Sequence, residues 1–408
     1  MENQNYDLVV FGATSFVGQI LCHYLASQYG TDKDLKWAIA GRSMSKLDAL
    51  KRDLDSTSLP VLQADAADLQ SLTALCEKTR VVISTVGPYA LYGEPLIRAC
   101  VQTGTDYCDL TGEVQWIRQM ITRYEEQAQA SGARIVHCCG FDSIPSDLGV
   151  WFLQNEATKN LGEPCTQVKM RVKAARGGLS GGTVASLINV TKEAAANPQL
   201  RKELANPFSL APEGHKSNQR QPNVKSAEYD PDFDVWLAPF MMAPINVRIV
   251  HRSNALQGAP YTEEFLYDEA MMTGKGMKGR LTALGITAAL GSFIAGAAIK
   301  PTRWVLEKFV VPKPGEGPSP EAQKNGFYDL RFLGMTASGK TVSTKVTGDM
   351  DPGYGSTGKM LGEAGVCLAL DIDKASTGGG FWTPASIFGE KLVNRLCENA
   401  GLTFERVG

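Results

Sequence analysis

Apolar and polar residues alternate in a regular rhythm through the first 140 residues of the chain. Short runs typical of buried strands occupy 8–11, 37–40, 60–65, 80–86, 107–109 and 134–138. Between several of them apolar residues recur at helical spacing, which predicts helices that begin near residue 16 and cover 94–103 and 114–130. Strands that alternate with helices form parallel, doubly wound sheets. The pattern therefore predicts an α/β fold for this part of the chain.

The first predicted strand ends in a glycine turn, Gly12 to Gly18, that leads into the first predicted helix. Backbone N–H groups at such a turn, together with the helix N-terminus, can bind a pyrophosphate. Ser15 stands where the dinucleotide fingerprint has its middle glycine, although its hydroxyl can still donate to phosphate. A tight strand-to-helix turn without a ligand gives a similar pattern. We interpret the turn as the start of a dinucleotide-binding Rossmann domain.

The end of the second predicted strand indicates which dinucleotide is bound. NAD sites usually carry an Asp or Glu at this point, whereas a site for the 2′-phosphate of NADP needs a cation and a hydroxyl. The chain has Gly41-Arg42-Ser43 here and no acid. The alternative to a phosphate contact is that Arg42 is simply a solvated residue at a strand end. The sequence predicts NADP(H) as cofactor.

Other strand ends should meet at the same edge of the parallel sheet. Asp65 follows the third strand, where it could meet an adenine amino group, and the fourth strand breaks at Gly87-Pro88. The predicted cofactor-binding residues are Gly12, Ala13, Thr14, Ser15, Phe16, Val17, Gly18, Arg42, Ser43, Asp65, Thr85, Val86, Gly87, Pro88 and Tyr89.

The pattern changes near residue 164 and predicts a second domain of α+β type with a mixed sheet. An alternating strand at 168–173, a helix at 183–196 and a long surface loop at 206–234 are followed by a hairpin of 327–333 with 340–346, and by helices at 358–370 and 386–399. We expect an NADP-binding domain over residues 1–150 and a substrate and dimerisation domain over 151–385. The helix at 386–399 is expected to pack back on the first domain.

Composition excludes several classes of protein. The 408 residues carry a net charge of −2 and are 43% hydrophobic, which fits a globular protein without the basic field of a nucleic-acid-binding protein. Nine cysteines without a C-x-x-C pair, and an N-terminus without a secretory apolar region, indicate a cytoplasmic protein with reduced thiols. We take the adjacent Cys138 and Cys139 as structural, and the four histidines predict no metal site.

The segment 281–299 is unusual because it runs for 19 residues without a charge. As a helix it would be about 28 Å long, close to the roughly 30 Å thickness of a bilayer's hydrocarbon core. It could be a buried or substrate-covering helix, an element at a membrane interface, or a membrane span. Our hypothesis is that residues 270–310 meet a lipid-like or acyl substrate, with the protein peripheral to a membrane.

Several motifs together resemble a known family, the saccharopine dehydrogenase-like oxidoreductases, which also includes trans-acting enoyl reductases of complex lipid synthesis. The matching segments are 11–18, 40–43, 86–89 with 92–93, 104–113, 140–147, 181–186, 351–355 and 379–385. The resemblance implies a Rossmann fold and hydride transfer. Saccharopine dehydrogenases need cations for an amino-dicarboxylate substrate, but Arg171, Lys173 and Arg176 are explained equally well as a solvated strand face.

Hydride transfer often needs an acid that supplies a proton. Tyr89, Tyr92 and Asp142 are the candidates, with Ser143 and Glu113 as alternatives. Each has a structural interpretation as well. The tyrosines could line the pocket wall, Asp142 or Ser143 could cap the helix that follows, and Glu113 could bind a backbone amide.

Three function classes remain open from the sequence. The first is an NADPH-dependent reductase of a C=C, C=O or C=N bond in an acyl or lipid-like intermediate. The second is a dehydrogenase of an amino-acid adduct, which would need carboxylate-binding arginines. The third is a non-catalytic NADP-binding protein associated with lipid or membrane.

Overall fold

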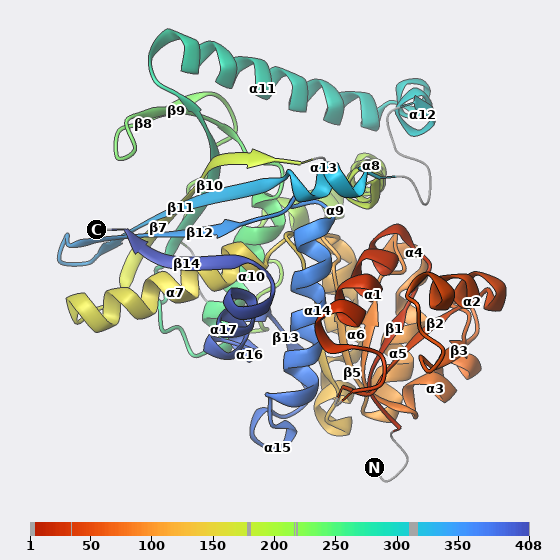
Figure 1. Cartoon of the computed structure of the whole chain (residues 1–408). Coiled ribbons are helices and arrows are strands. Elements are labelled where there is room, and N and C mark those ends of the chain that lie inside the picture. Colours follow the sequence, from red (N-terminus) through yellow and green to blue (C-terminus); the bar gives the residue numbers. More distant parts are fainter. Residues whose placement is uncertain are drawn as a thin grey trace.

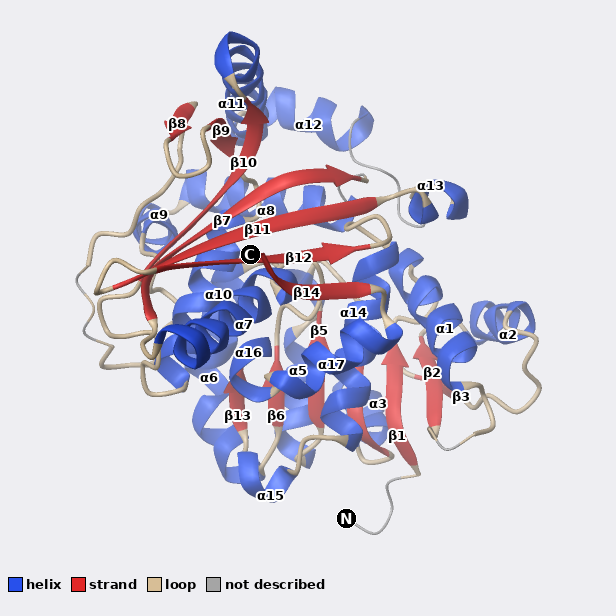
Figure 2. Ribbon diagram, turned by 60° about the vertical axis from the view of Figure 1, so that its left-hand side comes forward, coloured by secondary structure: helices blue, strands red, loops and turns tan. Residues whose placement is uncertain are grey.

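The computed structural model describes residues 5–33, 35–177, 181–215, 217, 219–309 and 317–407. This part of the chain contains two seven-stranded sheets. Figure 1 shows the chain from end to end, and Figure 2 shows the two sheets as separate layers, one parallel and the other a twisted fan. The predicted α/β fold with a second, mixed sheet is confirmed.

The first sheet is parallel throughout, with strand order β13-β6-β5-β4-β1-β2-β3. Leu8, Val9 and Val10 in its centre are fully buried, as expected for a strand covered by helices on both faces. The chain order reverses between β1 and β4, and ligands bind such sheets beyond the strand ends at this point. The strands are β1 (Tyr6–Phe11), β2 (Trp37–Gly41), β3 (Val61–Gln63), β4 (Thr79–Ser84), β5 (Asp106–Asp109), β6 (Arg134–Val136) and β13 (Gly380–Trp382).

Helices connect the first six strands and cover both faces of this sheet. They are α1 (Phe16–Tyr29), α2 (Met44–Asp53), α3 (Leu69–Cys76), α4 (Tyr89–Tyr92), α5 (Glu94–Thr103) and α6 (Val114–Ser131).

The second sheet has the order β14-β12-β11-β7-β10-β9-β8 and is mixed, because β7 runs parallel to β10 but antiparallel to β11. The predicted hairpin is confirmed, with Leu330 opposite Val346. The interpretation as a solvated strand face is wrong for Arg171, which is buried. Its guanidinium pairs with the carboxylates of Asp230 (2.8 Å) and Asp268 (2.7 Å). The strands are β7 (Cys165–Arg176), β8 (Glu228–Asp230), β9 (Val235–Pro239), β10 (Leu266–Gly274), β11 (Phe327–Thr336), β12 (Thr341–Gly348) and β14 (Leu402–Val407).

The later helices include one that departs from the sequence prediction. The single helix expected at 386–399 is two helices, because Gly389 has a φ of +51° that breaks the helical path. The helices are α7 (Ile144–Leu161), α8 (Gly181–Ala196), α9 (Pro198–Ala205), α10 (Ala243–Leu256), α11 (Gly276–Ala298), α12 (Lys300–Phe309), α13 (Pro320–Lys324), α14 (Gly355–Leu370), α15 (Lys374–Thr377), α16 (Pro384–Ile387) and α17 (Glu390–Asn399).

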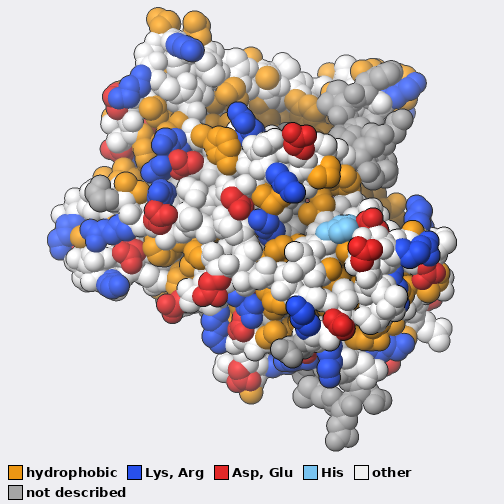
Figure 3. Space-filling model, in the orientation of Figure 1, with side chains coloured by type: hydrophobic (Ala, Val, Ile, Leu, Met, Phe, Trp, Pro, Cys, Tyr) orange, Lys and Arg blue, Asp and Glu red, His pale blue; other side chains and the backbone are white. Residues whose placement is uncertain are grey.

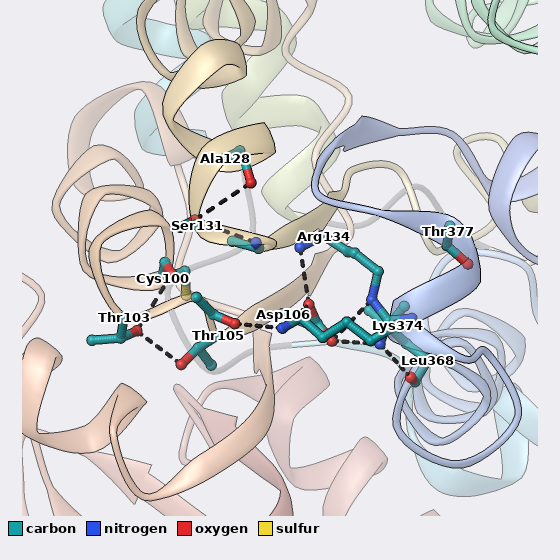
Figure 4. A network of polar contacts seen from close by, with 12 residues as sticks. Cys100, Thr103, Thr105, Asp106, Ala128, Ser131, Arg134, Leu368, Lys374 and Thr377 are labelled. Atoms are coloured by element: carbon teal, nitrogen blue, oxygen red, sulfur yellow. Dashed lines mark hydrogen bonds and ion pairs between the residues drawn. The ribbon is translucent and has the colours of Figure 1, made fainter. Parts of the chain in front are cut away.

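The C-terminal part of the chain returns to the first sheet. Helix α14 packs against β1, β4 and β5, and β13 pairs with β6. In the buried network of Figure 4, Arg134 contacts Asp106 at 2.5 Å and donates to the Leu368 and Ile372 carbonyls. The domain limits at 150 and 385 stay a prediction, although 355–370 and 380–382 pack with the first sheet.

Candidate functional site

A cavity of about 960 Å³ lies beyond the carboxyl ends of the first sheet's strands. Helices α8 and α10 form its opposite wall. Ala13, Gly18 and Ser43 do not line it; Ala13 is fully buried, and the Ser43 hydroxyl faces that of Ser45 at 3.1 Å. Twelve of the predicted cofactor residues do line it: Gly12, Thr14, Ser15, Phe16, Val17, Arg42, Asp65, Thr85, Val86, Gly87, Pro88 and Tyr89.

The glycine turn is shaped by close backbone packing. Gly12 has a φ of +84°, and a Cβ there would lie 2.7 Å from Val86 Cγ2. Gly18 is buried behind the turn, where a Cβ would meet the Gly12 carbonyl oxygen at 2.3 Å. Ser15 caps α1, since its Oγ accepts from the Gly18 N–H at 2.9 Å and lies 2.9 Å from Thr85 Oγ1. The serine in place of the middle glycine therefore serves helix α1.

Cations line one end of the cavity. Arg42 is exposed directly after β2, and Lys46 in the first turn of α2 lies near it on the cavity wall. Asp65 reaches the cavity from the segment after β3, where its carboxylate accepts from the Ala67 N–H at 3.0 Å. This end combines two positive charges with the N-terminus of α1 close by, an arrangement suited to phosphate groups.

The two candidate tyrosines differ in how free their hydroxyls are. Tyr89 is buried, and its hydroxyl donates to the Ser84 carbonyl oxygen at 3.0 Å. Burial raises the pKa of this phenol well above its usual value, and nearby Asp109 adds to the effect. Tyr92 also lines the cavity but is 50% exposed. Because the Tyr89 hydroxyl already donates its proton to the Ser84 carbonyl oxygen, the Tyr92 hydroxyl is more available to donate to a substrate.

Glu113 holds the start of α4 in place, and with it the loop after β4. Its fully buried carboxylate accepts from the backbone N–H groups of Tyr89 (2.8 Å) and Ala90 (2.9 Å). It also accepts from the Ser186 hydroxyl at 3.0 Å, which connects this loop to α8. Burial raises the pKa of Glu113. These contacts match the backbone-amide interpretation and make Glu113 a positioning residue for the cavity.

Asp142 lines the cavity in the segment after β6. Burial, and to a smaller extent the charge of Asp109, raises the pKa of its carboxyl to about 7. Neither Asp142 nor Ser143 caps α7 through its side chain, contrary to the structural interpretation. Ser143 instead donates to Asn246 Oδ1 at 3.0 Å. Asp142 is thus a carboxyl that is partly protonated at neutral pH and faces the cavity.

The wall opposite the strands could not be located from the sequence. It is mainly apolar and comes from α8, from the end of α9 and from the start of α10. Its residues are Ala185, Ser186, Leu187, Val190, Leu204, Met241, Met242, Pro244 and Ile245. Gly181, Gly182 and Tyr354, which also line the cavity, lie in segments that carried the family resemblance.

Arg248 on α10 is the third cation on the cavity wall, and it is buried. Its Nε donates to Ser209 Oγ at 3.0 Å, and its two Nη groups donate to the Leu204 and Pro244 carbonyls. Burial lowers its pKa to about 10, which leaves it charged at neutral pH. These neutral acceptors hold Arg248 in the wall between α9 and α10.

Comparisons with known proteins agree with this geometry. Residues 8–136 match the family described as saccharopine dehydrogenase NADP binding domain. They contain the glycine turn and nearly all of the first six strands of the parallel sheet. The chain is 40% identical over 404 residues to the Mycobacterium tuberculosis protein named "Putative trans-acting enoyl reductase Rv2449c", with 96% of each chain covered. The chain belongs to the saccharopine dehydrogenase-like oxidoreductases.

Two further comparisons extend the likeness along the whole chain. The chain is 36% identical over 410 residues to the trans-acting enoyl reductase of Mycobacterium bovis (strain BCG / Pasteur 1173P2), again with 96% of each covered. Apo saccharopine dehydrogenase (L-Glu forming) from Saccharomyces cerevisiae shares the fold, with a TM-score of 0.57, 14% identity, and coverage of 98% of this chain and 99% of that one. The protein is an NADP-binding oxidoreductase of this family.

Proposed function

We propose that the protein uses NADPH to reduce the C=C bond of an enoyl group in an acyl or lipid-like intermediate. The observation that carries the proposal is the division of one cavity into two ends. A glycine turn and two cations form one end, and an apolar wall from α8 and α10 forms the other. Relatives named as enoyl reductases support the choice of bond.

The residues at the first end fit NADPH. The Gly12 turn leaves no room for a Cβ and brings backbone close to the α1 N-terminus, where a pyrophosphate would bind. Arg42 and Lys46 would hold the 2′-phosphate, and Asp65 lies within the same end. The segment from Thr85 to Tyr89 would adjoin the nicotinamide half. When bound, the cofactor supplies a hydride.

Asp142 is the proton donor that we propose. Reduction of an enoyl group adds a hydride to the β-carbon and a proton to the α-carbon, and gives NADP⁺ and the saturated acyl group. A carboxyl with a pKa of about 7 is matched to proton donation at neutral pH. Tyr92 is the second candidate, because it lines the same cavity with its side chain half exposed.

The apolar wall favours an acyl substrate over an amino-acid adduct. A saccharopine-type substrate carries several carboxylates, which bind best to paired arginines. Among the described residues, the cavity-lining cations are Arg42, Lys46 and Arg248, and the first two lie at the cofactor end. Arg248 already donates to three neutral acceptors. Met241, Met242 and Leu187 instead offer an adaptable apolar surface.

The test is a comparison of substrates in the presence of each reduced cofactor. We expect NADPH oxidation with 2-enoyl thioesters, little NADPH oxidation with simple imines of amino acids, and little reduction of NADP⁺ when saccharopine is the substrate. NADPH should bind more tightly than NADH. Turnover of the amino-acid adduct alone would support the second class, and tight NADPH binding with no turnover of any substrate would support a non-catalytic protein.

A further inference from the structure

Helix α11 exposes the apolar side chains that a surface helix normally buries. Among the described residues it is the one helix long and apolar enough to cross a membrane, yet only 11% of its most apolar stretch is buried. On the inner side, Ala283 and Ala297 are fully buried and Phe293 is partly buried. Met277 is 66% exposed, Leu281 61% and Leu284 48%. A helix that is apolar on all sides is usually covered on all sides.

Helix α12 continues this surface. Ile299 is 56% exposed, and Trp304 (56%) and Val305 (45%) follow on α12. We call the exposed apolar residues of both helices the α11–α12 ridge: Met277, Leu281, Leu284, Ile294, Ile299, Trp304 and Val305. In Figure 3 orange side chains mark the top of the molecule along this ridge.

Both ends of α11 are held against the body of the protein. At its start, Thr273 Oγ1 donates to the Gly279 carbonyl oxygen at 2.9 Å. Near its end, Ala297 packs with Val184 and Ile188 of α8. A helix fixed at both ends along the protein surface cannot cross a bilayer without leaving these contacts. The ridge is therefore placed to lie in the plane of a membrane interface rather than to span it.

The charges around the ridge favour an anionic lipid surface. Residues 270–309 contain six Lys and Arg residues and one Glu, whereas the whole chain has a net charge of −2. Lys275 pairs with Asp234, and Arg280 lies 5.3 Å over the Trp236 ring. Basic residues lie at both ends of α11, so a second copy packed along this helix in either direction would bring like charges together.

Helix α8 connects the ridge to the cavity. One face of α8 carries Val184 and Ile188, which pack beneath α11. The other face carries Leu187 and Val190, which line the cavity. The ridge and the apolar end of the cavity thus lie on the two sides of one helix.

We propose that the α11–α12 ridge docks on the surface of an anionic lipid bilayer and presents the cavity to substrates held there. The docking stands on the ridge alone, and the delivery of an acyl substrate past α8 rests on the proposed function. Apolar side chains enter the interfacial layer, while the cations at both ends meet lipid phosphates and carboxylates.

The experiment is flotation of the full-length protein with phosphatidylcholine vesicles that contain or lack phosphatidylserine. We expect binding to vesicles with phosphatidylserine and weaker binding to those without it. The double variant Leu281→Ser/Leu284→Ser should lower the partition coefficient by about tenfold or more, because two exposed apolar side chains are lost. Leu370→Ser, on the far end of α14 and 49% exposed, is the matched control and should bind like wild type.

Several results would overturn the docking proposal. The proposal is contradicted if the wild-type protein floats with neither kind of vesicle. It is also contradicted if the Leu281→Ser/Leu284→Ser variant binds as well as wild type. A wild-type dimer that the same variant converts to monomer would assign the ridge to a second copy instead. NADPH binding and turnover of a short, soluble enoyl thioester are measured on the same samples. They test the proposed function without vesicles, so the two proposals can fail separately.

Discussion

The cavity has two walls with different origins. The cofactor wall consists of strand ends and the glycine turn, in which Gly12 packs closely against Thr85 and Val86. The opposite wall consists of side chains from α8 and α10, which the chain brings together from distant segments. The cofactor wall should therefore tolerate almost no added atom at its glycine turn, whereas the apolar wall should respond gradually to lost contact area.

The largest effect is expected at the boundary between the two walls. Asp142→Asn removes the proposed proton donor, so kcat should fall by about a hundredfold to ten-thousandfold with little change in NADPH affinity. In wild type, reduction should slow as pH rises above about 7, because the raised pKa keeps the Asp142 carboxyl protonated only below that value. The variant should lack this decline. An unchanged kcat in Asp142→Asn would show that a group other than Asp142 donates the proton.

Gly12→Ala tests the intolerance of the cofactor wall. The added Cβ would lie 2.7 Å from Val86 Cγ2 and 2.8 Å from Thr85 Oγ1, so the turn must shift. We expect about a hundredfold loss of NADPH affinity, measured by cofactor fluorescence. Gly162→Ala is the control, because Gly162 has a similar φ of +81° with nothing near its Cβ position. Equal NADPH affinity in both variants would argue against a pyrophosphate site at the turn.

Arg42→Ala tests whether this wall selects NADP. Loss of charge-assisted bonds to a 2′-phosphate should weaken NADPH by about tenfold to a hundredfold and leave NADH nearly unaffected. Arg80→Ala, near the opposite end of the sheet's strands and paired with Asp7 at 3.5 Å, is the matched control. Titration of both reduced cofactors into each protein measures the effect. Equal weakening of NADPH and NADH by Arg42→Ala would contradict the assignment.

Leu187→Ala tests the gradual response of the apolar wall. Removing part of one lining side chain should raise KM for a long-chain enoyl thioester by about tenfold, since roughly 1 to 2 kcal/mol of apolar burial is lost. NADPH affinity should not change. Leu370→Ala serves as the distant control. A larger effect on NADPH than on the acyl substrate would assign Leu187 to the cofactor wall.

The cofactor wall was largely predictable because its signals are local. Most strands in the first sheet have an apolar run, and parallel strands bring their ends to one edge, so Arg42, Asp65 and Thr85 could be placed together. Ser15 has a second role that its position did not indicate. The phosphate contact stays a prediction, and the structure shows in addition that Ser15 caps α1, since its Oγ accepts from the Gly18 N–H.

The opposite wall was not predictable for a physical reason. Helix α10 buries Asn246, Arg248 and Arg252 in hydrogen bonds, so its sequence lacks the apolar periodicity of a buried helix. The sequence shows that the segment 281–299 is apolar, but only the structure shows that Leu281, Leu284, Ile294 and Ile299 are exposed. Both facts depend on contacts between segments far apart in the chain.

Reduction of an enoyl group by NADPH can be tested by following the transferred hydride. The protein would be given NADPH deuterated at the transferring position together with a 2-enoyl thioester, and the product analysed by mass spectrometry and NMR. We expect a saturated thioester with one deuterium on the β-carbon. Deuterium on a carbinol carbon, or no transfer to any acyl substrate while NADPH stays bound, would contradict this expectation.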